Sequence, residues 1–172
     1  MWQHTIDRRI MADDVGRAYR RAGFRVKSDQ HTFSFPRLSP ATLNTRATVT
    51  IQIDRDALFV WVATCSSKRQ GGFASSVAGL GLQITDLSTR YSFAGPDLLP
   101  SEAFTGSAES PYILPFPYIF APGSTVRADV IHLSGGGLSA APGTTPVLFD
   151  LSLIGMKLWT IPYTRDVLQP EH

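Results

Sequence analysis

Residues 47–54 alternate strictly between apolar and polar side chains, and no other feature of the chain constrains its fold as tightly. A period of two residues places successive side chains on opposite faces, as in a β-strand with one buried face. The apolar members would face a core and the polar members solvent: Ala47, Val49, Ile51 and Ile53, against Thr48, Thr50, Gln52 and Asp54. The pattern predicts a strand here, and Arg55 and Asp56 suit a tight turn after it.

Further segments rich in β-branched and aromatic residues bring the expected number of strands to about eight. They are residues 33–35, 58–63, 82–87, 91–93, 112–120, 125–133 and 147–158. Glycine and proline make up 26 of the 172 residues, so turns are frequent, and we expect loops at residues 66–81, 95–110 and 134–145. Gly155 interrupts the last strand and predicts a bulge or a close backbone approach. Many short strands predict an all-β fold, either an antiparallel β-sandwich or a jelly-roll-like domain.

Positive charge is concentrated in residues 1–27, which we define as the basic arm. This segment carries seven basic residues against three aspartates, a net charge of +4, whereas the rest of the chain has a net charge of −2. The basic residues are Arg8, Arg9, Arg17, Arg20, Arg21, Arg25 and Lys27. The basic pI of the protein therefore comes from the arm and not from the body.

The arm has the pattern of a short helix over residues 10–22. Its apolar residues repeat with helical spacing: Val15, Ala18, Tyr19 and Ala22. Gly23 would end such a helix, but Gly16 lowers the helix propensity by about 1 kcal/mol relative to alanine. A short helix and an extended arm both stay open.

Two interpretations of the arm's function also stay open. Its arginines alternate with Tyr19 and Phe24 and could neutralise nucleic-acid phosphates. Its three aspartates and the slightly acidic body favour docking onto a protein instead. The predicted protein-contacting residues of the arm are Arg8, Arg9, Arg17, Tyr19, Arg20, Arg21 and Arg25.

Residues 111–122 combine four prolines with aromatic side chains. Proline has no backbone N–H, so this segment cannot be a central strand, and we expect an edge strand or a polyproline-like crossing. A stiff segment loses little entropy on binding, and aromatic side chains are frequent interface hot spots. We predict protein contacts through Tyr112, Phe116, Tyr118 and Phe120; alternatively, these rings cover one end of the core.

Residues that catalyse reactions or bind metals show no pattern typical of a site. The four histidines are scattered and Cys65 is the single cysteine, so we expect no metal site, no cofactor and no internal disulfide. The glycines at 135–137 lack the lysine of a phosphate-binding loop, and no nucleophile elbow is present. We expect a protein that is not an enzyme, with Cys65 as a buried apolar residue.

Four segments follow one another along the chain in an order that resembles a known protein family. The stretch PYILPFPYIFAPGSTVRADV (residues 111–130) leads, after a glycine loop, to VLFDLSLIGMKLW (residues 147–159), and residues 48–59 and 82–90 precede them. This order resembles that of minor structural proteins of tailed bacteriophages, of the capsid-decoration or head-associated kind. The basic arm lies outside the likeness.

The resemblance implies a non-enzymatic virion protein that binds the major capsid protein or other virion proteins, stabilises the lattice and self-associates. No apolar run resembles a signal peptide or a membrane span, so we expect synthesis in the host cytoplasm and no membrane contact. Alternatives are a connector or tail-associated protein, or a receptor- or carbohydrate-binding module in which Trp61, Trp159 and Tyr163 form a stacking platform. The expected organisation is the basic arm at 1–27, a β-sandwich at 28–162 and a tail at 163–172.

Overall fold

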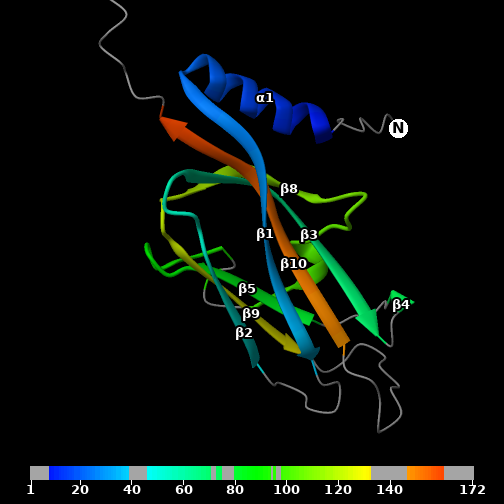
Figure 1. The fold of residues 1–172 in the computed structure, drawn as a ribbon. Coiled ribbons are helices and arrows are strands. Elements are labelled where there is room, and N and C mark those ends of the chain that lie inside the picture. Colours follow the sequence, from blue (N-terminus) through cyan, green and yellow to red (C-terminus); the bar gives the residue numbers. More distant parts are fainter. Residues whose placement is uncertain are drawn as a thin grey trace, which may run out of the picture.

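Strand pairing in the computed structural model divides the chain into two antiparallel sheets (Figure 1). In sheet A, β10 (Val147–Thr160) lies between β1 (Phe24–Leu38) and β3 (Leu58–Gln70). Two further strands pair with β3: β4 (Phe73–Ala74) and β8 (Tyr112–Phe120). The structure describes residues 8–38, 46–70, 73–74, 80–93, 95, 98–132 and 147–160.

Sheet B is built around β9 (Thr125–His132), which pairs with β2 (Arg46–Gln52) on one side and β5 (Leu80–Asp86) on the other. The short strands β6 (Tyr91–Ser92) and β7 (Leu99–Pro100) pair with β5. A 3-10 turn, η1 (Ser101–Ala103), follows β7.

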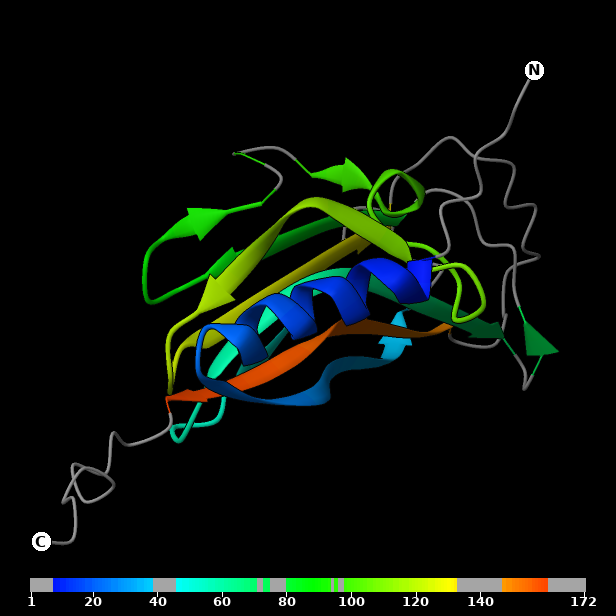
Figure 2. The same ribbon diagram turned by 90° about the horizontal axis from the view of Figure 1, so that it is seen from above.

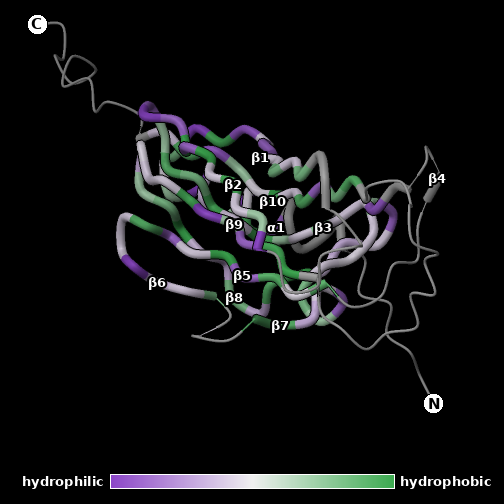
Figure 3. Tube along the Cα trace, turned by 90° about the horizontal axis from the view of Figure 1, so that it is seen from below, coloured by the Kyte–Doolittle hydropathy of each residue, from purple (hydrophilic) through white to green (hydrophobic). Residues whose placement is uncertain are grey.

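The inner faces of the two sheets form one apolar core, which confirms the predicted antiparallel β-sandwich. Alternate residues of the longer strands supply it, and Figure 3 shows apolar and polar positions along these strands. Its largest fully buried members are Trp61, Phe33, Phe35, Phe59, Phe120 and Phe149. The alternation predicted at residues 47–54 is confirmed over β2, whose odd-numbered residues are half-buried and whose even-numbered residues are exposed; beyond the strand, Ile53 is buried and Asp54 is half-buried.

Helix α1 (Arg8–Arg21) lies on the outer side of sheet A, so the arm is helical rather than extended (Figures 1 and 2). Val15 and Tyr19 pack against a second apolar cluster on that face, whereas Ala18, predicted to share their stripe, is exposed. Gly23 follows the helix with a φ of +86°, a conformation that glycine adopts without steric cost. The predicted stop is therefore confirmed.

Three predicted boundaries move in the structure. β1 begins at Phe24, so the boundary after residue 27 falls inside a strand and the arm ends at Gly23. β3 continues to Gln70, where residues 66–70 were expected to be loop, because β10 is long enough to pair with it throughout. β1 continues past Pro36 to Leu38, with a register shift opposite the proline, whose ring removes one ladder hydrogen bond. The predicted loop at 134–145 and the tail at 163–172 lie outside the described residues.

Gly155 marks a bulge in sheet A, as its position in the last strand predicted. The register of β10 against β3 shifts between Ile154 and Gly155, so that Val62 has no partner. A Cβ atom at Gly155 would lie 2.0 Å from the carbonyl oxygen of Val60. The two backbones can therefore approach this closely only at a glycine.

Candidate functional site

The outer face of sheet A carries α1 and a surface of mixed apolar and basic character. Underneath the helix is the second cluster, whose buried members come from β3 and β10: Val60, Val62, Ala63, Met156 and Leu158. Val15 and Tyr19 cover part of this cluster, and Tyr19 contacts the ring of Phe24 edge-on, with the centroids 5.8 Å apart. Arg17, Arg20 and Arg21 are exposed. The helix is thus held by its apolar side and presents its arginines to solvent.

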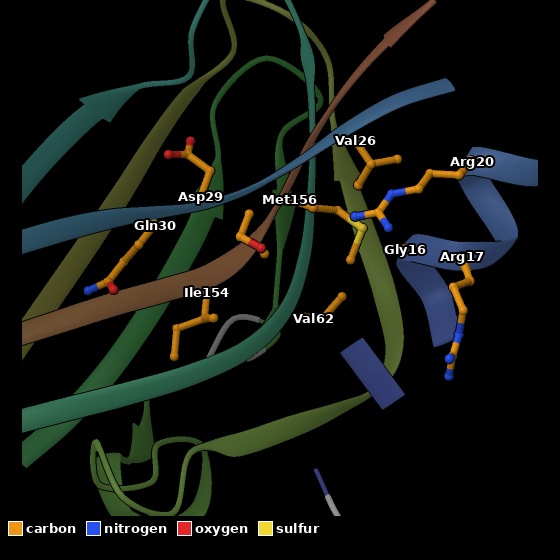
Figure 4. Close-up of a pocket in the computed structure, with 11 residues that line it drawn as sticks. Gly16, Arg17, Arg20, Val26, Asp29, Gln30, Val62, Ile154 and Met156 are labelled. Carbon is orange, nitrogen blue, oxygen red and sulfur yellow. The ribbon is translucent and has the colours of Figure 1, made fainter. Parts of the chain in front are cut away.

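A groove of about 770 Å³ lies between α1 and the strands beside it (Figure 4). Its floor is aliphatic and comes from three strands: Val26 of β1, Val62 of β3, and Ile154 and Met156 of β10. Its remaining walls are Gly16, Arg17, Arg20, Ser28, Asp29, Gln30 and Gly155. We call this feature the α1 groove.

The two arginines of the α1 groove differ in their surroundings. Arg17 forms an ion pair with Asp14 one turn earlier, and both side chains are exposed. Arg20 forms no hydrogen bond or ion pair with any side chain in the described part of the chain. In Figure 4 Arg20 extends from α1 toward the strands that floor the groove, whereas Arg17 points away from them. Arg20 is therefore the free cation of the groove.

β8 borders the same face and presents one aromatic ring to solvent. β8 pairs with β3 at both of its ends, through Tyr112 and Ile113 at one end and through residues 118–120 at the other. Between these ends, residues 114–117 of β8 lie opposite the single residue Val62 of β3. Pro115 and Pro117 lie in this bulge and flank Phe116, which is 85% exposed. β8 pairs with no described strand other than β3, which confirms the predicted edge strand.

The other predicted aromatic contacts of β8 are not available at the surface. Phe120 is fully buried in the sandwich core, so its prediction as a contact residue is wrong: its side chain points inward from a paired position opposite Phe59. Tyr112 and Tyr118 are half-buried and pack against the same core. The alternative interpretation, in which these rings cover the core, therefore holds for three of the four.

Tyr118 is fixed by hydrogen bonds as well as by packing. Its hydroxyl donates to the buried Asp86 (3.0 Å), and its ring stacks on that of Tyr91 at 5.6 Å. Burial, more than any other cause, raises the pKa of Tyr118. Asp86 also accepts hydrogen bonds from the backbone N–H groups of Ser88 and Thr89, which shapes the turn between β5 and β6.

The predicted arm residues are divided between two elements. Arg8 and Arg9 lie in the first turn of α1, and Arg17, Arg20 and Arg21 follow on its exposed side. Tyr19 packs inward and is not presented to a partner. Arg25 belongs to β1, where its guanidinium lies 5.5 Å from the centre of the Trp159 ring. Of the described arm side chains, Arg17, Arg20 and Arg21 are thus the exposed arginines that α1 carries.

The proposed tryptophan platform is not formed. Trp61 is fully buried and its indole N–H donates to the carbonyl oxygen of Ala63 at 2.8 Å. Trp159 donates to Asp56 and carries Arg25 over its ring. Tyr163 lies outside the described residues. Trp61 cannot contribute to a surface for sugar stacking, because the strand order places its side chain in the core.

A small ionic cluster closes one end of sheet A. Lys157 pairs with Asp54 and lies 3.5 Å from a carboxylate oxygen of Asp29, and the Nε2 atom of His31 is 3.3 Å from that same oxygen. Burial lowers the pKa of His31, and the charge of Lys157 lowers it too, although Asp29 opposes both effects. His31 also contacts the ring of Phe59 edge-on. These interactions hold the turn at Asp54 against β1 and β10.

Cys65 of β3 is a free, half-buried thiol. Burial raises its pKa, although a hydrogen bond with Ser152 opposes the shift. Among the described residues, no three His, Cys, Asp or Glu side chains come together as a metal site would require. Within the same residues, no helix is long and apolar enough to cross a membrane.

Comparison with known proteins leaves the chain without a family. No protein-family model matches it, and neither does any curated protein. Among solved structures it is similar to the infectious bursal disease virus VP2 subviral particle, with a TM-score of 0.34 and 14% sequence identity over 78% of this chain. The match spans 36% of that viral protein. The residues of the outer face of sheet A are therefore the basis for a functional assignment.

Sequence analysis found the arginines and Phe116 but missed the α1 groove. The floor residues Val26, Ile154 and Met156 are ordinary strand residues in the sequence. The groove exists because α1 covers only part of sheet A. The position of a helix on a sheet cannot be predicted from the local sequence of the helix. Gly16 faces the strands in the structure, a position that the sequence alone did not assign to it.

Proposed function

We propose that the protein is a non-enzymatic structural component of a virion, and that it attaches to a capsid lattice in a decoration role through the outer face of sheet A. One observation carries the proposal: the arm and the proline-aromatic strand, about 90 residues apart in the sequence, flank the same face. Ile113 of β8 packs in the same apolar cluster as Val15 and Tyr19 of α1. We propose that the arginines of α1 and the exposed Phe116 contact one partner together.

Two attachment points on one rigid face suit assembly. When one contact forms, the other is already near its target, so the effective concentration at the second contact is high without any new affinity. An exposed phenylalanine held between prolines also gives a rigid anchor with little entropy to lose. The expected partners are the major capsid protein or other virion proteins, with self-association on the lattice and assembly after synthesis in the host cytoplasm.

The test is to purify particles and count the copies of the protein on each. A high copy number that matches the lattice symmetry supports decoration, and a low number instead supports the alternative role at a connector or tail. Phe116→Ser should lower the number of attached copies, while Leu87→Ser, which removes a 39% exposed apolar side chain from the turn after β5, should not. Absence of the protein from particles, or equal attachment of both variants, would contradict the proposal.

Deletion of the arm is a poor test of attachment in this fold. Removing residues 1–27 would take away the first residues of β1 and uncover Val60, Met156 and Leu158 beneath α1. Substitutions on the exposed side of the helix avoid this damage. They leave Val15 and Tyr19 in place, so a loss of attachment reports on the surface alone.

A further inference from the structure

We infer that the α1 groove binds an acidic, extended segment of a neighbouring virion protein, whose aliphatic side chains rest on the groove floor while a carboxylate pairs with Arg20. This inference rests on the proposed function and names the chemistry of the partner at one part of the interface. The observation that supports it is that Arg20, which has no partner among the described residues, lies beside the apolar floor of the groove.

The floor of the groove selects for aliphatic side chains. Val26, Val62, Ile154 and Met156 supply it, and Val62 and Met156 are already at least nine-tenths buried. The α1 groove has the volume typical of a ligand site, roughly 300–1,000 Å³. A chain segment that lays one or two aliphatic side chains here would remove the remaining exposed apolar surface from water.

Arg20 selects for a carboxylate. Arg20 is exposed, and its aliphatic stem extends toward the floor, so its charged end lies beside apolar surface that an incoming segment would cover (Figure 4). A charge beside apolar surface interacts more strongly with an incoming opposite charge, because water screens the pair less. Charge-assisted hydrogen bonds from guanidinium to carboxylate are also the strong class of such bonds. Arg17 does not compete for this role, because it is already paired with Asp14.

The composition of the groove favours a protein segment over nucleic acid. No aromatic side chain lines it, so a base would find no ring to stack on. Ser28 and Gln30 continue the wall along β1 with neutral polar groups that suit a peptide backbone.

The binding test uses the full chain and a fluorescein-labelled peptide of alternating aspartate and leucine. Fluorescence anisotropy should show saturable binding, which is lost when serine replaces leucine or lysine replaces aspartate in the peptide. Arg20→Glu should weaken binding roughly tenfold or more, as expected for losing one charge-assisted contact. Arg21→Glu is the matched control, because it makes the same charge change one residue away on the same helix but lies outside the groove lining. It should leave the affinity within about twofold, the limit expected for a screened charge outside the site.

Three results would overturn the inference: no saturable binding of the peptide, equal losses in the two variants, or tighter binding of oligothymidylate than of the peptide. The last would indicate a phosphate site. Failure of this inference can be told apart from failure of the proposed function by counting copies on particles. If Arg20→Glu loses the peptide but attaches as well as the wild type, the groove has no role in attachment and the proposed function stands. If the wild type does not attach, the proposed function fails whatever the peptide result.

Discussion

The two outer faces of the sandwich differ in what their charged residues contact. On sheet B, the buried Asp129 accepts hydrogen bonds from Arg46 (2.9 Å) and Thr48 (2.6 Å), and the Nε atom of Arg127 lies 3.0 Å from it. On sheet A, Arg20 has no partner among the described residues and stands over an aliphatic floor. Charges that already pair with one another form few new ion pairs when a partner binds. An unpaired cation beside apolar surface can gain both a new ion pair and apolar burial on binding. This difference supports the proposal that the side of sheet A meets a partner.

The largest effect is expected from Gly155→Ala, which would break the bulge next to the α1 groove. The added Cβ would lie 2.0 Å from the backbone oxygen of Val60 and 2.9 Å from the ring of Phe59, so two paired strands must separate. We expect a loss of about 3 kcal/mol or more in the free energy of unfolding, measured by urea denaturation. A loss below about 1 kcal/mol would show that the bulge is not rigid.

Asp129→Ala should remove the bond network that completes the face of sheet B. Arg46, Arg127 and Thr48 would lose their shared acceptor, although both arginines are partly exposed and can turn to water. We expect a loss of about 2 kcal/mol in the free energy of unfolding. Asp14→Ala is the matched change on the side of sheet A, and because its pair with Arg17 is exposed it should cost at most about 0.5 kcal/mol. Equal losses of unfolding free energy in the two variants would contradict the difference described between the two faces.

Gly16→Ala should stabilise the side of sheet A without disturbing its packing. A Cβ there would approach no atom closer than 3.9 Å, the distance to Met156 and Val26, so there is room for it. Alanine also favours the helix by about 1 kcal/mol relative to glycine, and we expect a gain of up to that size in the free energy of unfolding. A loss of stability would mean that α1 sits closer to the strands than this spacing allows.

The smallest effect should be the pH dependence contributed by His31. Its pKa is lowered in the folded state, chiefly by burial, so the unfolded chain binds the proton more readily. Stability from this group is therefore complete above the ordinary histidine pKa of about 6.5 and declines as the pH falls below it. Thermal melts between neutral and mildly acidic pH should show this decline, and His31→Gln should reduce it. An identical decline in the variant would assign the effect to other groups.

The fold could be predicted well from the sequence because its signals are local. The alternation in residues 47–54 gave the buried face of β2, and the run at 58–63 gave a core strand that contains Trp61. The candidate site could be predicted only in part. Phe116 and Phe120 belong to one proline-rich segment, yet one is 85% exposed and the other fully buried.

That difference arises from pairing between distant strands. Tyr118 and Phe120 pair in register with β3, which turns Phe120 into the core, while the bulge opposite Val62 releases Phe116 from the ladder. Arg20 and Arg21 are likewise neighbours in one helix, and only the position of α1 over β1 and β10 makes one of them a groove residue. Neither distinction is present in the local sequence.

By itself, the sequence determined a β domain, the strand faces and a basic N-terminal segment, because side-chain periodicity and charge are properties of neighbouring residues. The tertiary structure alone decided that the arm is a helix docked on sheet A, that β8 bulges beside it, and that a groove with one free arginine remains between helix and strands. These features depend on contacts between residues far apart in the chain, where the burial of apolar surface, and not local propensity, selects the arrangement.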